Sequence, residues 1–103
     1  MEIFTDGPTI HLSGDFDVRS TMEVRNAIYE HLLGRDEDVV VDLTGVTTID
    51  KTALKVLAVA TRQATRAGRR LTLRGCGPSV RRMLHLTHLI RLVEVERHPA
   101  AVG

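Results

Sequence analysis

The chain has 103 residues, of which 43% are hydrophobic and 26% charged, which suits one compact domain and excludes two. Fourteen Lys and Arg against thirteen Asp and Glu leave a formal net charge of +1, and the aromatic residues are Phe4, Phe16 and Tyr29. Nucleic-acid binding is disfavoured, because it relies on a basic excess and on stacking rings. The single cysteine, Cys76, excludes an internal disulfide.

The N-terminus lacks the basic segment and long apolar run of a signal peptide. The longest apolar-rich stretch, 53–60, is interrupted by Lys55 and is far shorter than the ~20 residues that span a bilayer. We therefore expect a cytoplasmic protein with no membrane insertion. The sequence does not indicate an oligomeric state.

The first half of the chain predicts a hairpin, a helix and a buried strand. Residues 1–12 have apolar side chains on both sides of an Asp-Gly-Pro turn signal, which predicts a short hairpin. Residues 20–33 have apolar side chains mostly at steps of three and four, typical of an amphipathic helix. Residues 39–43, with three valines and a leucine, predict a central parallel strand covered on both faces.

The next segment predicts a loop followed by a βαβ crossover. Residues 44–50 are polar and contain a glycine, so we expect a loop there. Residues 51–67 are rich in helix formers, and Asp50 stands where it can cap the first turn of that helix. Residues 70–74 form another short apolar strand, which should run parallel to the preceding one.

The last third predicts a helix that begins near Pro78, a strand over 92–95 and a loose tail over 98–103. The predicted class is therefore α/β, with a mixed sheet of four to five strands packed with three to four helices. One domain spans residues 1–103, with its core over about 9–95. Binding sites in such sheets gather beyond the carboxyl ends of the strands.

Three motifs occur in order along the chain: Ser-Gly-Asp-Phe-Asp at 13–17, Val-Val-Val-Asp-Leu-Thr-Gly-Val at 39–46, and Thr-Ile-Asp-Lys-Thr-Ala-Leu at 48–54. Together they resemble the STAS domains, a family of bacterial anti-sigma factor antagonists and related modules. The family pattern is a Gly-acidic-hydrophobic-Asp turn, an apolar strand ending in Asp-Leu-Ser/Thr, and an Asp-Ser-Ser/Thr-Gly-Leu helix start. The resemblance extends from about Ile10 to Val95.

The resemblance implies a regulator of transcription that is not an enzyme and needs no cofactor. Such an antagonist binds an anti-sigma factor, a histidine-kinase-like serine/threonine kinase, and thereby frees a sigma factor; phosphorylation abolishes the binding. Carried over residue by residue, the phosphoacceptor is Thr52. The residues that we expect to contact the partner are Asp15, Asp17, Thr47, Thr48, Asp50, Lys51, Thr52, Leu54 and Lys55.

The sequence departs from the family at two positions beside Thr52. Lys51 replaces the first hydroxyl residue after the capping aspartate, and Ala53 replaces the usual glycine. We therefore expect phosphorylation of Thr52 to be less efficient than in relatives with the intact motif. The departures also keep open a second function: a STAS scaffold or transporter-associated subunit that docks on an ATPase without a phosphorylation cycle.

Plainer interpretations stay open for the same residues. Thr52 can simply occupy the first helical turn, Lys51 can be a solvated lysine, and Asp50 can act as a helix cap alone. The helix over 51–67 is apolar almost all round at its start, which indicates either burial on several sides or a face offered to a partner. We expect its apolar residues near Leu54 and Leu57, with the loop over 44–50, to form the docking surface.

Metal and enzyme chemistry are only weakly indicated. Three carboxylates near strand ends invite comparison with a Mg²⁺ site or a phospho-receiver domain: Asp15, Asp17 and Asp42. A receiver domain also needs a late lysine, whereas no lysine follows Lys55. His85 and His88 are spaced to share a helix face but have no third zinc ligand, and Cys76 has no histidine near it in sequence.

Overall fold

A four-stranded mixed sheet organises residues 1–96, which are the residues that the computed structural model describes. Strands β1 (Glu2–Asp6) and β2 (Thr9–Phe16) form the predicted antiparallel hairpin at one edge. Strand β2 then pairs in parallel with β3 (Val39–Ile49), and β3 pairs in parallel with β4 (Leu71–Arg74). The predicted α/β class and mixed sheet are confirmed.

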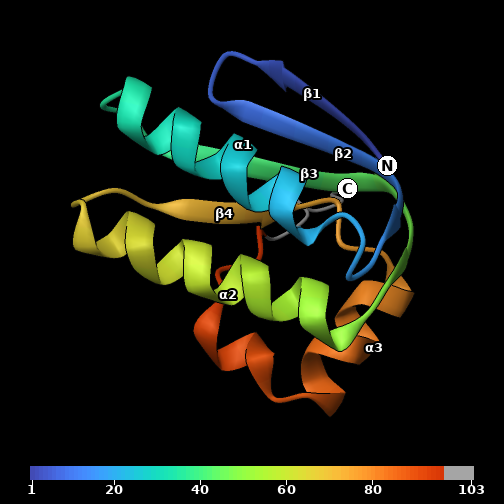
Figure 1. The fold of residues 1–103 in the computed structure, drawn as a ribbon. Coiled ribbons are helices and arrows are strands. Elements are labelled where there is room, and N and C mark those ends of the chain that lie inside the picture. Colours follow the sequence, from blue (N-terminus) through green and yellow to red (C-terminus); the bar gives the residue numbers. More distant parts are fainter. Residues whose placement is uncertain (97–103) are drawn as a thin grey trace, which may run out of the picture.

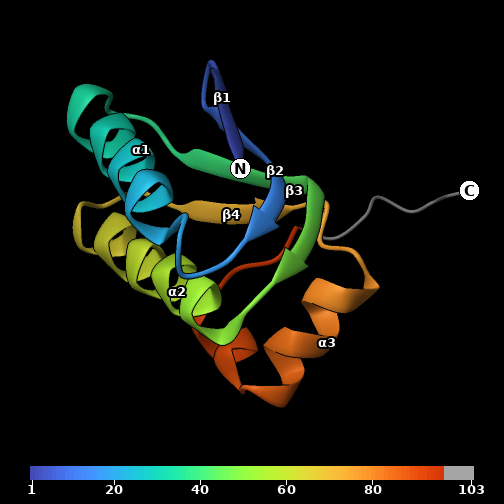
Figure 2. The same cartoon turned by 45° about the vertical axis from the view of Figure 1, so that its right-hand side comes forward.

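Two long helices cover one face of this sheet. Helix α1 (Thr21–Gly34) and helix α2 (Lys51–Arg66) run side by side in front of the strands (Figure 1). Helix α3 (Pro78–Leu86) lies near the end of the molecule where α2 begins, and a 3₁₀ turn, η1 (Leu89–Leu92), packs against α2 and α3 (Figure 2). The carboxyl ends of β2 and β3 therefore meet the start of α2.

The core forms between the sheet and the two helices. Side chains of a strand alternate between its faces, so every second residue is buried in β4 and in the first part of β2 and of β3. The buried strand residues include Ile10, Leu12, Val39, Val41, Leu43, Leu71 and Leu73. Each helix adds a buried stripe. Val24 and Ile28 belong to α1, and Leu54, Leu57 and Ala64 belong to α2. The expected cover on both faces of the strand over 39–43 is wrong, because the helices pack on one face (Figure 1) and Val40 and Asp42 on the other are only partly buried.

The predicted loop over 44–50 is wrong, because β3 continues to Ile49. This half of the strand pairs with residues 13–16 of β2, with register shifts that bend the two strands together. Gly45 allows the close approach, since a Cβ at that position would lie 2.7 Å from the Cβ of Ser13. A polar segment thus becomes a strand because its neighbour supplies the hydrogen-bond partners.

The predicted last strand over 92–95 is not formed as a regular strand. The chain forms η1 instead, and Val95 makes a single parallel bridge to Leu73 of β4. The predicted tail over 98–103 lies outside the described residues. Among residues 1–96, no helix is long and apolar enough to cross a bilayer.

Candidate partner-binding site

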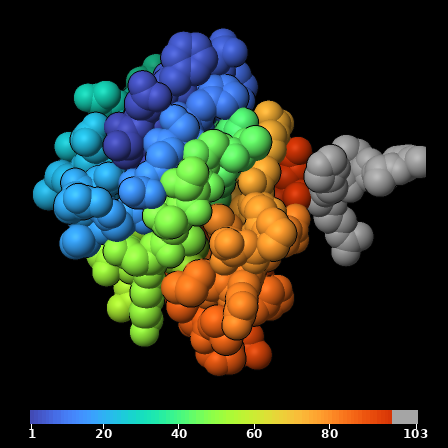
Figure 3. Space-filling view, turned by 90° about the vertical axis from the view of Figure 1, so that its right-hand side faces the viewer, coloured from blue at the N-terminus to red at the C-terminus, as the bar shows by residue number. Residues whose placement is uncertain are grey.

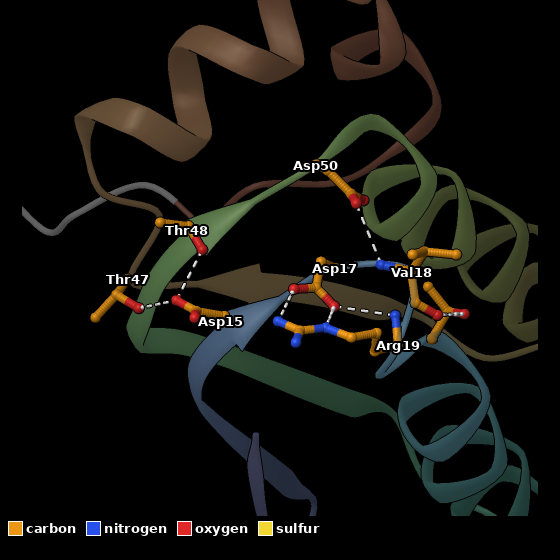
Figure 4. A network of polar contacts seen from close by, with 8 residues as sticks. Asp15, Asp17, Val18, Arg19, Thr47, Thr48 and Asp50 are labelled. Carbon is orange, nitrogen blue, oxygen red and sulfur yellow. Dashed lines mark hydrogen bonds and ion pairs between the residues drawn. The ribbon is translucent and has the colours of Figure 1, made fainter.

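The carboxyl ends of β2 and β3 form a polar surface beside the start of α2, which we call the polar edge: Asp15, Asp17, Thr47, Thr48 and Asp50. Figure 3 shows this end of the molecule, with β2 in blue, the end of β3 in green and α3 in orange next to one another. The strand register places Asp15 opposite Thr48, so residues 33 positions apart become neighbours. Figure 4 shows how their side chains are connected.

Asp50 joins three elements at this edge. Its Oδ1 accepts a hydrogen bond from the backbone N–H of Ala53 at 2.8 Å, which is the predicted N-cap of α2. Its Oδ2 accepts another from the backbone N–H of Val18, in the turn between β2 and α1, at 3.2 Å (Figure 4). The carboxylate therefore holds the α1 turn against the α2 start.

Asp15 holds two threonine hydroxyls of β3. The Oγ1 atoms of Thr47 and Thr48 each donate to Asp15 Oδ1 at 2.9 Å. These hydrogen bonds, from Thr48 first and then Thr47, stabilise the ionised carboxylate and lower the pKa of Asp15. The Asp15 carboxylate is thus held in its ionised form by two hydrogen bonds from threonines of the same chain.

Asp17 pairs with Arg19, a partner that sequence reasoning missed. The guanidinium Nη2 of Arg19 lies 2.8 Å from Asp17 Oδ2, and the Arg19 backbone N–H donates to Oδ1 at 2.9 Å. The side-chain bond from Arg19, followed by the backbone bond, lowers the pKa of Asp17. The Asp-x-Arg spacing is the signal that could have predicted the pair.

The carboxylates and histidines that invite comparison with a metal site do not converge. Asp42 lies away from the polar edge, where His11 Nδ1 is 3.0 Å from its Oδ2 and the Thr44 hydroxyl donates to its Oδ1 at 2.6 Å. His88 follows α3 in a left-handed conformation, so it does not share a helix face with His85. Within residues 1–96, no group of three or more His, Cys, Asp or Glu side chains is placed to hold a metal ion.

Thr52 differs from the threonines of the polar edge. It is exposed in the first turn of α2, two residues after the capping Asp50. No hydrogen bond found among the described residues uses its hydroxyl, whereas those of Thr47 and Thr48 are bonded to Asp15. Thr52 is therefore an exposed threonine whose hydroxyl is not engaged by the described residues.

A surface hollow lies between α1 and α2 beside Thr52. The sequence analysis did not predict it. It has a volume of about 270 Å³ and is lined by Arg25, Tyr29, Thr52, Lys55, Val56 and Val59. The lining is mostly apolar, with the cations of Arg25 and Lys55 beside it. The α2 contributors recur at steps of three and four residues, a spacing that could have marked this stripe in the sequence.

Comparisons with known proteins now decide the family. The family model described as the MlaB STAS domain matches residues 4–94. The chain belongs to the STAS domain family. A STAS-domain containing protein of Pseudomonas aeruginosa (strain UCBPP-PA14) is 30% identical over 87 residues, which cover 84% of this chain and 85% of the relative. The resemblance inferred from the three motifs is confirmed.

Solved structures of other STAS-like proteins share the fold. An anti-sigma factor antagonist from Mycobacterium paratuberculosis has a TM-score of 0.78 and 20% identity, covering 97% of this chain and 86% of the other. A sulfate transporter family protein from Wolinella succinogenes has a TM-score of 0.69 and 18% identity, covering 88% and 76%. At these identities the likeness establishes the common fold.

The structure shows where this STAS domain places its two departures from the family motif. Lys51 is exposed beside Thr52, while Ala53 is fully buried, so its methyl group packs into the core and cannot obstruct a partner at the surface. Of the two departures, Lys51 is therefore the one at the surface beside Thr52.

The expected docking surface needs one further correction in this STAS domain. Leu54 and Leu57 are both 0% exposed and pack in the core, so neither can contact a partner in the folded protein. The exposed side of α2 carries Lys51, Lys55 and Val59 instead.

Proposed function

We propose that this STAS domain is a regulatory binding module of the anti-sigma factor antagonist type. Its partner would be an anti-sigma factor, a histidine-kinase-like serine/threonine kinase, and its switch would be phosphorylation of Thr52. The contact surface would comprise the polar edge and the exposed start of α2, including Lys51 and Lys55. Such a role implies a cytoplasmic protein that acts by binding rather than by chemistry of its own.

The accessible hydroxyl of Thr52 carries this proposal. A kinase must bring the γ-phosphate of ATP close to the acceptor oxygen, and Thr52 is exposed with a hydroxyl that is not engaged by the described residues. Its place in the first turn of α2 also suits the product, because the positive end of the helix dipole stabilises a phosphate.

A phosphate on Thr52 would change the surface far more than the fold. It adds about −1.5 to −2 charges and three acceptor oxygens at an exposed position beside Lys51 and Lys55. A partner that packs on this part of α2 would meet a strongly hydrated dianion. Phosphorylation should therefore release the partner while the domain stays folded.

The test is phosphorylation by the histidine-kinase-like serine/threonine kinase encoded in the same genome, with ATP and Mg²⁺. Wild type should be modified and Thr52→Ala should not. Lys51→Ser should be modified faster, because it restores the hydroxyl and removes a long charged side chain, although Lys51 could also attract the incoming phosphate. Thr65→Ala is the matched control, since Thr65 is another exposed threonine of α2.

Phosphate retained in Thr52→Ala would overturn the assignment of the site. Absence of phosphate on wild type and on Lys51→Ser would instead favour the second candidate function, a STAS subunit that docks on a transporter ATPase without a phosphorylation cycle. Two observations support that candidate: Lys51 stands where antagonists have a hydroxyl, and a sulfate transporter family protein shares this fold. Capture of partners from native cells, identified by mass spectrometry, separates a kinase from a transporter ATPase.

A further inference from the structure

The hollow beside Thr52 continues along the helix pair. A second hollow of about 220 Å³ is lined by Tyr29, Leu32, Leu33, Gln63, Ala67 and Arg69. Tyr29 lines both hollows, so they adjoin along α1 and α2, and we call the two together the helical groove. On α2 it extends from Thr52 to Ala67, a span of about 22 Å at 1.5 Å per residue.

The helical groove has an apolar lining that the fold leaves exposed. Leu33 is 88% exposed and Val59 is 51% exposed, although both lie on helices that pack against the core. Val56 and Tyr29 are partly buried between them. Exposed apolar side chains that gather along one part of a surface are typical of a site that binds another protein.

All the charged side chains that line the helical groove are cationic. Arg25, Lys55 and Arg69 line it, and no acidic residue lines either hollow. Helix α2 itself carries four cations and no anion. The arginine–carboxylate ion pairs of the described residues use Arg19, Arg35, Arg70 and Arg74.

The groove cations are therefore not neutralised by carboxylates of the described chain. Arg25 instead lies over the Tyr29 ring, 5.0 Å from its centre, and Arg69 donates to the backbone carbonyls of Leu32 and Arg35.

We propose that the helical groove binds an acidic amphipathic helix of the partner protein. A helix of about four turns matches the length of the groove, its apolar face would cover Val56 and Val59, and its flanking carboxylates would pair with Arg25 and Lys55. Charge complementarity selects this occupant over a basic or an uncharged helix.

The helical groove also provides a mechanism by which phosphorylation would release the partner. This step rests on the proposed phosphorylation of Thr52. Thr52 lines the same hollow as Arg25 and Lys55, so its phosphate would pair with the cations that the partner helix needs. Phosphorylation would then displace the helix by competition within the groove.

The test uses a designed amphipathic peptide of about 16 residues, with leucines on one face and glutamates beside them. A matched peptide has lysine in place of every glutamate. Each is titrated at low salt into the ¹⁵N-labelled, unmodified full chain and followed by NMR. We expect saturable shifts of α1 and α2 amides with the glutamate peptide and none with the lysine peptide. Equal binding of both peptides, or shifts confined to other elements, would overturn the proposal.

A pair of surface variants sharpens the result. Val59→Glu should weaken the glutamate peptide at least tenfold, because it places a carboxylate in the groove. Leu86→Glu is the matched control, since Leu86 is 66% exposed on α3 and does not line the groove; its affinity should equal that of wild type. Circular dichroism verifies that both variants are folded. Unchanged affinity in Val59→Glu would overturn the proposal.

The same variants distinguish this proposal from the proposed function. If the native partner is captured equally well by wild type and Val59→Glu, the helical groove is not the docking site but the binding module stands. If wild type captures neither a kinase nor a transporter ATPase, the proposed function itself fails, whatever the peptides do.

Discussion

The polar edge and the helical groove lie on either side of the α2 start and use their charges in opposite ways. At the polar edge, the carboxylates of Asp15, Asp17 and Asp50 are bonded to groups of their own chain. In the helical groove, Arg25 and Lys55 lie beside apolar side chains and form no ion pair with a described carboxylate. The acidic motif is therefore engaged in the fold, and the unsatisfied charge belongs to the cations.

This difference gives the aspartates of the family motif a structural role in this protein. The aspartates of the motif hold β2, β3 and the two helix starts together, so their substitution should affect stability first. Thr52 stands where the two surfaces meet, because it follows the Asp50 cap and lines the groove. The proposed phosphate on Thr52 would therefore act on the groove without breaking the polar edge.

The largest expected effect is a difference in the free energy of unfolding between substitutions on the core side of α2 and substitutions on its groove side. Leu54→Ala should lower the free energy of unfolding by about 2–5 kcal/mol, because Leu54 is completely buried. Val59→Ala should change it by less than about 0.5 kcal/mol, since Val59 is half exposed and alanine favours helix. Urea denaturation measures both. A small loss in Leu54→Ala together with weaker partner binding would return Leu54 to the docking surface.

An intermediate effect is expected for the cap at the polar edge. Asp50→Ala should destabilise the protein by about 0.5–2 kcal/mol, because it removes the hydrogen bond to the Ala53 N–H. For a domain of this size, each kcal/mol lowers Tm by about 4–8 °C. Asp50→Asn should stay near wild type, since asparagine also caps helices well.

Thermal unfolding followed by circular dichroism measures this difference. Asp36→Ala, at an exposed aspartate that caps no helix, is the control. Equal losses in Asp50→Ala and Asp50→Asn would mean that the charge, rather than the cap geometry, matters.

The smallest expected effect concerns the pKa of Asp15. Its hydrogen bonds lower the folded-state pKa, so their contribution to stability is present above the unfolded value of about 3.9 and is lost as pH falls through the folded pKa. The double variant Thr47→Val, Thr48→Val removes both donors and keeps β-branched residues in the strand. NMR titration should show the Asp15 pKa rising towards its ordinary value.

The same variant should also show a weaker dependence of stability on pH in this acid range. An Asp15 pKa identical to that of wild type would show that the two hydroxyls do not stabilise the carboxylate.

The regular elements were predictable because each depends on local pattern. Apolar spacing over 20–33 and a run of helix formers over 51–67 identified both long helices, and the valine run at 39–43 identified the central strand. The second half of β3 was missed, because its polar character and Gly45 indicated a loop, although Thr, Val and Ile all favour strands. These residues become a strand through pairing with β2 residues that lie 32 or 33 positions earlier in the chain.

The sequence by itself determined the family, the α/β class and the identity of the motif residues, because these follow from residue order and short-range periodicity. The tertiary structure decided which of those residues face outward. Leu54 and Val59 are both apolar residues of α2, yet one is in the core and the other in the helical groove. The two lie about 140° apart around the helix, and the packing of α2 on the sheet and on α1, through contacts between distant segments, decides which of these sides is buried.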